Sequence, residues 1–215
     1  IRYYAKLRSS LVPYLYTMAY KAYTEAMPML RPLPLMFPND VRFDDVKNAY
    51  MLGDSLYVGV FDMHLLLPEG EWIDYFTGDV YEGEFKNGLM DGEGTYTWQN
   101  GSVYTGGFRE GKKDGAGKFV WNYGDTYEGN YRMDQKEGHG VYTWKNGDVY
   151  DGEYAADARS GQGMYTWANG EKYEGTFKNN VMWGEGKYTW PSGRVYTGYF
   201  ENGIIVRVVG GEDTE

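Results

Sequence analysis

Side chains that could do acid–base chemistry occur in two short clusters in the first third of the chain. Asp44 and Asp45 are adjacent, and Glu69, Glu71 and Asp74 follow close to one another. Two carboxylates held about 5–10 Å apart can hydrolyse a glycosidic bond. Neighbouring carboxylates on loops are far more often solvated charges, so we predict no catalytic residue in this chain.

Metal and cofactor sites are also not predicted. His64 and His139 lie far apart in the chain, and neither has ligand residues at short spacing. Five Gly-x-Gly pairs, the first at Gly92 and Gly94, invite comparison with phosphate-binding loops. Such a loop joins a strand to a helix N-terminus, whereas strands are expected on both sides here. The Asn-Gly and Asp-Gly turns lack the shorter repeat of calcium-binding β-rolls.

A 23-residue repeat accounts for these glycines and organises the chain from Tyr81 onward. Its second half reads Gly-x-Gly-x-aromatic-x-Trp and occurs five times. A fixed period of this length indicates a repeat architecture, in which stacked supersecondary units share one core. The first half reads Tyr-x-Gly-x-Phe/Tyr and begins six times, at Tyr81, Tyr104, Tyr127, Tyr150, Tyr173 and Tyr196.

Within each copy the residues alternate with a period of two. Tyr81, Gly83 and Phe85 share one side, while charged residues between them share the other. That alternation predicts half-buried strands, and Asn87-Gly88 and Asn100-Gly101 supply turns. We therefore predict a mainly β fold: an elongated, curved single antiparallel sheet of stacked β-hairpins. Its inner face is aromatic, its outer face is polar, and an N-terminal α+β segment caps one end.

The aromatic face is the candidate binding surface. In one interpretation, its rings pack on one another and are the core of the sheet. In a second, they form a groove for a partner helix or peptide, because one layer of sheet cannot cover its own face. In a third, they form a surface on which a sugar stacks. The candidate partner-binding residues are Tyr96, Trp98, Trp121, Tyr142, Trp144, Tyr165, Trp167, Trp183, Tyr188 and Trp190.

Trp183 is the exceptional member of that set. It precedes the fifth Gly-x-Gly pair, where the earlier copies carry Asp91, Asp114, Glu137 and Ser160. We predict that this position lies on a turn, and that Trp183 is an exposed contact point for a partner.

The repeated pattern Y-x-G-x-[FY]…G-x-G-x-[YF]-x-W…G over residues 81–203 resembles the MORN repeat (membrane occupation and recognition nexus). The resemblance implies a twisted array of β-hairpins used for assembly, scaffolding and sometimes attachment near membranes. It does not imply catalysis.

Residues 1–83 carry a second set of motifs: Val12–Thr17 with Ala19, Met29–Leu33, Phe37–Asp40, Ala49–Leu56 and Leu67–Gly78. These stretches resemble glycoside hydrolase family 31, which contains α-glucosidases and α-xylosidases. In that family this segment is the last helix and strand of a (β/α)8 barrel and the first strands of a small β-domain. Both catalytic aspartates lie upstream, so none is carried over. We infer a fusion or chimera of the two families.

Three parts follow from these patterns: a glycosidase-like remnant over 1–80, five complete repeats and a half repeat over 81–203, and a closing strand and acidic tail over 204–215. In the first part we predict a helix over 1–26, extended pieces at 29–31 and 33–37, and strands over 50–61, 63–67 and 71–76. In the last part residues 204–209 form the strand, and 210–215 form a frayed tail.

Composition excludes several function classes. The formal net charge of −10 disfavours nucleic acid and anionic membranes as partners. The absence of cysteine excludes disulfides and thiolate metal sites, and no apolar run is long enough to span a bilayer. With no signal-peptide pattern, we expect a cytoplasmic location. The start at Ile1 indicates a fragment.

The expected function is therefore that of a non-catalytic protein-interaction or scaffolding module without cofactors. Its expected partner is a protein or peptide, and its open sheet edges also predict a homodimer. One alternative is a fragment of a family 31 glycoside hydrolase that lacks its catalytic aspartates. A further alternative is recognition of membrane phospholipid, which the negative charge disfavours.

Overall fold

The chain forms two compact units, Ile1–Pro68 and Glu69–Glu215. We describe each unit by itself, from a computed structural model. The structure describes residues 11, 14–16, 18–19, 21–24, 30–32, 36, 39, 49–52, 56–59, 70–73, 77–86 and 89–212.

The first unit contains helical residues and a small sheet. The described residues between Leu11 and Thr24 are helical, which agrees with the predicted helix. Its apolar face includes the buried Met18. The sheet has the order β1-β2-β3, with β1 at Leu30–Pro32, β2 at Ala49–Leu52 and β3 at Leu56–Gly59.

Two further predictions for this unit have different outcomes. Met36 is helical, so the prediction of an extended piece over 33–37 is wrong there. The prolines around it suit the first turn of a helix as well as an extended chain. The predicted strand over 63–67 lies outside the described residues.

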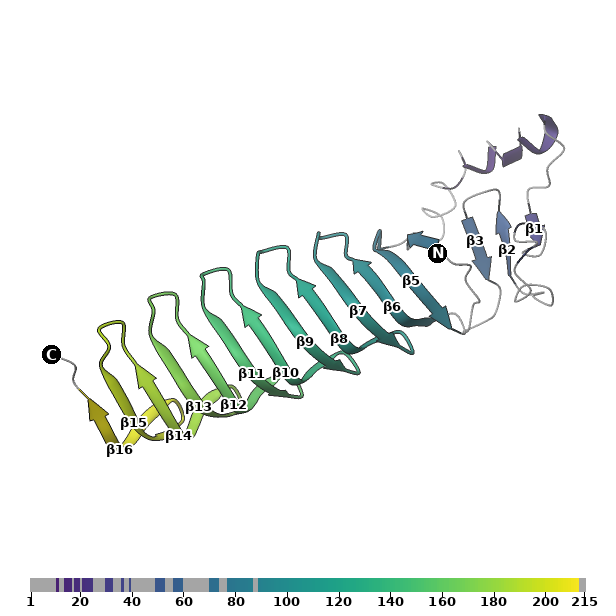
Figure 1. The fold of residues 1–215 in the computed structure, drawn as a ribbon. Coiled ribbons are helices and arrows are strands. Elements are labelled where there is room, and N and C mark those ends of the chain that lie inside the picture. Colours follow the sequence, from purple (N-terminus) through teal and green to yellow (C-terminus); the bar gives the residue numbers. More distant parts are fainter. Residues whose placement is uncertain are drawn as a thin grey trace, which may run out of the picture. The chain divides into compact units, whose positions relative to one another are not determined.

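The second unit is one thirteen-stranded antiparallel sheet in which each strand pairs with its neighbours in sequence. Figure 1 shows these hairpins stacked side by side along the array, as the sequence predicted. The strands are β4 Gly70–Ile73, β5 Val80–Lys86, β6 Leu89–Thr97, β7 Val103–Arg109, β8 Lys112–Val120, β9 Thr126–Arg132, β10 Gln135–Thr143, β11 Val149–Ala155, β12 Ala158–Thr166, β13 Lys172–Lys178, β14 Val181–Thr189, β15 Val195–Glu201 and β16 Ile204–Glu212.

The strands bend toward their aromatic side. The ring centroids of Tyr104 and Phe108 are 5.1 Å apart, although four residues of a straight strand span about 13 Å. The register of β7 and β8 shifts between Gly106 and Phe108, where a bulge allows the bend. The aromatic inner face of the predicted curved sheet is therefore confirmed.

A tyrosine lying over a pair of glycines explains this bend. Gly129 of β9 pairs with Gly140 of β10, and the ring of Tyr127 covers both. A Cβ atom added to Gly140 would lie 2.4 Å from the Tyr127 hydroxyl oxygen and 2.6 Å from two ring carbons. The hydroxyl donates a hydrogen bond of 3.0 Å to the carbonyl of Asn130. We call this arrangement the tyrosine–glycine contact. It recurs at Tyr81, Tyr104, Tyr150 and Tyr173.

The same tyrosines join each repeat to the next. Tyr127 makes edge-to-face contacts with Tyr131 of its own repeat at 5.1 Å and with Tyr154 of the following repeat at 5.3 Å. Such pairs stabilise by about 0.5–1.5 kcal/mol beyond the area they bury. The series is continuous from Phe85 and Tyr81 to Phe200. It forms the core of the array.

At one end of the strands, the turns from Glu110-Gly111 to Asn202-Gly203 have two residues, both with positive φ. Asn202-Gly203 has the composition such turns favour. Met133-Asp134 and Ala156-Asp157 do not, although Met133 has φ 50° and Ala156 has φ 48°. The aspartates compensate. The carboxylate of Asp134 accepts from the Lys113 N–H at 3.0 Å, and its own N–H donates to the Lys113 carbonyl at 2.9 Å. Each such turn is thereby fixed to the preceding repeat.

The C-terminal strand is longer than predicted. β16 continues to Glu212 because Gly210, Gly211 and Glu212 pair with Thr197, Tyr196 and Val195 of β15. The prediction of a frayed tail from residue 210 is therefore wrong up to Glu212. Gly210, Gly211 and Glu212 supply hydrogen-bond partners for backbone groups of β15 that this side of the strand would otherwise leave unpaired.

Replacing Gly140 with Ala is expected to destabilise the array by about 2–3 kcal/mol, because the new methyl group overlaps the Tyr127 ring. Urea unfolding followed by circular dichroism measures this. Gly210→Ala is the control, since a Cβ there meets open space. Equal stability of the two variants would contradict the tyrosine–glycine contact.

Candidate partner-binding surface

A second row of rings runs beside the core series along the aromatic face. Neighbouring ring centroids in this row are 4.3–5.4 Å apart. Every predicted binding residue except Trp183 belongs to it. We call it the Trp/Tyr stripe; its members are Tyr96, Trp98, Phe119, Trp121, Tyr142, Trp144, Tyr165, Trp167, Tyr188 and Trp190.

Phe119 is the member that the sequence reasoning omitted. It occupies the position of Tyr96 one period later, so the repeat itself carried the signal. Phe119 is buried, whereas the other rings of the stripe are half-buried and pack against the core. The stripe is thus the outer layer of the core and also a surface that solvent reaches.

The tryptophan N–H groups of the stripe are unpaired. None of the indole N–H groups of Trp98, Trp121, Trp144, Trp167 and Trp190 donates a hydrogen bond within the described part of the chain. Among the described residues, every side-chain nitrogen or oxygen that is fully buried has a hydrogen-bond partner. An indole nitrogen without a partner is therefore not fully buried. These N–H groups therefore contact solvent, and they form a row of hydrogen-bond donors with one donor per repeat.

Carboxylates along the stripe hold its tyrosines by hydrogen bonds. The Tyr142 hydroxyl donates to Asp125 at 2.6 Å, and the Lys145 N–H donates to the same carboxylate at 2.9 Å. In the preceding repeat Phe119, which has no hydroxyl group, replaces the tyrosine. In that repeat Ser102 replaces the aspartate, and its hydroxyl accepts a hydrogen bond from a backbone N–H. The two positions change together, so the acid's role is to orient the ring.

Asp79 and Asp148 make the same contacts with Tyr96 and Tyr165. The backbone N–H of Gln99, and then the Tyr96 hydroxyl, lower the pKa of Asp79. For Asp148, burial works against the charged form, but donated hydrogen bonds outweigh burial, and the net pKa is also lowered. These carboxylates are therefore occupied by the fold itself.

Three cations lie between the core series and the stripe. The Lys136 ammonium is 5.3 Å from the Tyr142 ring centre and 5.6 Å from that of Tyr127. Lys113 and Arg159 lie over rings in the same way. Desolvation lowers the pKa of both lysines. The side chain of Lys136 is only 18% exposed, and its ammonium also lies 3.9 Å from the Asp157 carboxylate. Arg159 in turn donates to the Asn180 carbonyl at 2.7 Å, so these cations are used by the fold.

The structure corrects the prediction for Trp183. This residue lies inside β14 and is half-buried, with the Lys178 ammonium 4.6 Å from its ring. The turns precede this position in each copy. In the third copy the equivalent Glu137 accepts from the Ala156 N–H of the following turn at 3.0 Å. At this position Trp183 replaces a side chain that can accept a hydrogen bond from the following turn. Trp183 also lies apart from the stripe.

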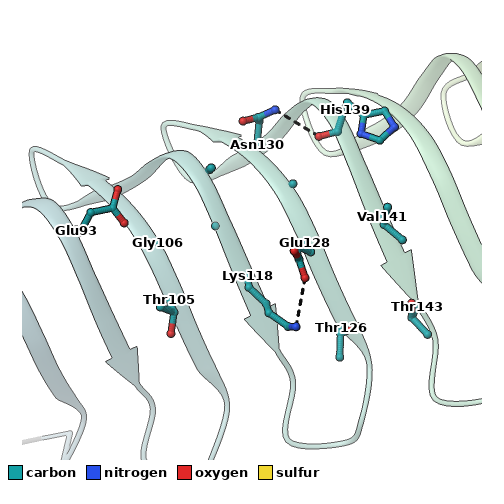
Figure 2. Close-up of a pocket in the computed structure, with 13 residues that line it drawn as sticks. Glu93, Thr105, Gly106, Lys118, Thr126, Glu128, Asn130, His139, Val141 and Thr143 are labelled. Carbon is teal, nitrogen blue, oxygen red and sulfur yellow. Dashed lines mark hydrogen bonds and ion pairs between the residues drawn. The ribbon is translucent and has the colours of Figure 1, made fainter.

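The opposite, polar face carries a hollow of about 920 Å³ (Figure 2). Three of the ionisable side chains that line it have a partner. Lys118 and Glu128 form an ion pair at 3.2 Å, and His139 lies 2.8 Å from Asp151. Figure 2 also shows Asn130 donating to the His139 carbonyl. Cross-strand pairing accounts for this face, and none of the predicted binding residues lines it.

Within the described ranges, no three histidine or acidic side chains gather closely enough to hold a metal ion. The predicted acid clusters, Asp44-Asp45 and Glu69–Asp74, include no described carboxylate that could be placed in a site. Among the same residues, no helix has the length and apolarity needed to cross a membrane.

Two protein-family models match parts of this chain. The MORN repeat model matches residues 104–126, 127–149, 150–172 and 173–193. These are MORN repeats. The model of the glycosyl hydrolase family 31 C-terminal domain matches residues 26–106. That match includes the first copy of the repeat, at 81–103, although this copy folds as the MORN repeats after it do.

Curated relatives match the family 31 part. The chain is 39% identical over 84 residues to 1,3-alpha-isomaltosidase of Kribbella flavida, covering 36% of this chain and 12% of the relative. It is 39% identical over 84 residues to human neutral alpha-glucosidase AB, covering 35% and 9%. It is 31% identical over 87 residues to the alpha-xylosidase of Saccharolobus solfataricus, covering 37% and 12%. The chain thus spans a small fraction of these relatives.

A solved structure of the CPAP G-box domain aligns with a TM-score of 0.44 and 11% identity, covering 67% of this chain and 74% of that one. This similarity is too low to support an argument about function.

Replacing Asp148 with Ala is expected to cost about 1–2 kcal/mol, because the Tyr165 hydroxyl and the Ala168 N–H lose their acceptor. Chemical denaturation measures the change. The matched control is Asp151→Ala, which removes an exposed contact with His139 and should change stability by under about 0.5 kcal/mol. A larger loss in the control would contradict the role assigned to Asp148.

High pH should unfold the array. Desolvation raises the pKa of Tyr81, Tyr150 and Tyr173 to about 12. A group with a raised pKa in the fold stabilises fully below its unfolded pKa, about 10 for tyrosine. That stabilisation is lost as the pH rises from about 10 to 12. Tyrosinate absorbance and sheet circular dichroism should change together; ionisation of these tyrosines with the sheet intact would refute this.

Proposed function

We propose that this chain is a non-catalytic protein-interaction module, and that it holds a protein or peptide partner against the Trp/Tyr stripe. The observation that carries the proposal is the row of half-buried tryptophans with indole N–H groups in contact with solvent. Aromatic residues with a polar tip are enriched at protein interfaces and at binding hot spots. A scaffolding role follows from the length of the array, which presents the same surface in successive repeats.

A homodimer through the sheet edge remains a separate prediction. β16 forms one edge of the sheet and exposes Ile204, Val206 and Val208. Its pairing with β15 is interrupted by two register shifts, and bulges of this kind work against edge-to-edge association.

A cytoplasmic location is likewise a proposal, which imaging of a tagged chain tests.

The family 31 segment favours a second proposal, that the parent polypeptide includes a glycosidase. The observation behind it is the match of residues 26–106 to the family's C-terminal domain. We expect no turnover of an aryl α-glucoside by the 215-residue chain. Measurable turnover would overturn the non-catalytic proposal for this chain.

The interaction proposal predicts the behaviour of a triple variant in which Trp98, Trp144 and Trp167 are replaced by Ala. Quantitative affinity enrichment from cells should lose partners relative to the unaltered chain, while circular dichroism shows the sheet intact. A matched control replaces Thr105, Lys118 and Val141 on the polar face and should keep these partners.

Two outcomes contradict the proposal. Unfolding of the tryptophan variant would show that the stripe is only core. Unchanged enrichment would show that the stripe binds no partner. Co-sedimentation with anionic vesicles that weakens with salt would instead favour phospholipid recognition, which the net charge of −10 opposes.

A further inference from the structure

We infer that the segment bound by the Trp/Tyr stripe is proline-rich, lies along the array as a polyproline II helix, and meets successive tryptophans with every third residue. This inference rests on the proposed function, and it names the chemistry of the partner. Two independent features carry it: the spacing of the tryptophans and their unpaired donors.

The first feature is spacing. One tyrosine or phenylalanine ring lies between each two successive tryptophans of the stripe. The largest separation is from Trp167 through Tyr188 to Trp190, with centroid distances of 5.4 Å and 4.6 Å. Neighbouring tryptophan rings are therefore at most about 10 Å apart. Two strand spacings give about 9.6 Å per repeat. A polyproline II helix has three residues per turn with a rise of 3.1 Å each, or about 9.3 Å per turn. One turn of the ligand therefore matches one repeat.

The second feature is hydrogen bonding. A proline-rich segment has backbone carbonyl acceptors but few N–H donors, and none of its carbonyls is used internally. The stripe offers the complement, an indole N–H in each of five repeats without an acceptor within the described residues. A bound α-helix would have most of its carbonyls already satisfied. The donors of the stripe therefore fit a polyproline II ligand better than a helical one.

Proline also suits the rings themselves. Proline-rich segments dock onto aromatic-lined grooves elsewhere because they are preformed and lose little entropy on binding. The stripe is a continuous series of half-buried rings across five repeats. A ligand spanning all five tryptophans needs four turns, about 13 residues.

The test uses the full 215-residue chain and a synthetic peptide of about 13 residues with proline at every third position and Ser, Ala or Glu between. A control peptide has the same composition with the prolines clustered. Isothermal titration calorimetry measures affinity, and ¹⁵N NMR follows the indole N–H signals. We expect the periodic peptide to bind at least roughly tenfold more tightly than the control, and the indole signals of the stripe to shift.

Point variants separate donors from packing. Trp144→Phe and Trp167→Phe keep an aromatic ring and remove the N–H, and each should weaken the periodic peptide by roughly threefold to tenfold. Trp183→Phe is the matched control and should leave affinity unchanged, because Trp183 lies apart from the stripe.

Equal binding of both peptides, absence of binding, or unchanged affinity in the two stripe variants would overturn the inference. Failure here is distinct from failure of the proposed function. If affinity enrichment finds a partner that needs Trp98, Trp144 and Trp167 but binds through a helix or a segment without proline, the interaction module stands and the proline-rich ligand is wrong.

Discussion

The packing of one tyrosine ring onto two paired glycines is the constraint on which the array depends. Because Gly129 and Gly140 have no side chain, the Tyr127 ring lies directly on the backbone of both strands. The strands bend around the ring, and its hydroxyl fixes the bend at the Asn130 carbonyl. The bent strands bring the rings of successive repeats into edge-to-face contact. A single layer of sheet thereby acquires a core without a second layer.

This core also explains where the binding surface lies. The edge-to-face series fills the bend, so the second row of rings must lie beside it, half-buried, with its indole N–H groups in solvent. The array starts before the repeat pattern does. β4, in the segment matched by the family 31 model, pairs Gly70 with Gly83 just as Gly94 pairs with Gly106. The two family patterns therefore meet within one continuous sheet.

Most of the repeat architecture could be predicted from sequence, because each copy confirms the others. The period of 23 residues, the alternation from Tyr81 and the Asn100-Gly101 turn predicted the hairpins and the aromatic inner face, and the structure confirms them. Three features could not be predicted. Nothing local marks Ala156 for positive φ, since its turn is imposed by bonds to the preceding repeat. The sequence predicts a turn at Trp183, because the bulge in the pairing of β13 and β14 hides the true strand boundary. The extension of β16 depends on pairing with β15 rather than on local sequence. For the candidate site, the sequence predicts the row of rings, but the unpaired donors and the neighbouring cations depend on the three-dimensional packing.

The measurement that tests this account most directly is the proton NMR shift of the glycine α-protons beneath the tyrosines. A ring face lying on Gly94, Gly117, Gly140, Gly163 and Gly186 should move at least one α-proton of each glycine far upfield. Gly210, with nothing near it, should show an ordinary shift. Ordinary shifts at all five glycines would contradict the ring-on-glycine packing, and with it the bend, the core and the surface derived from them.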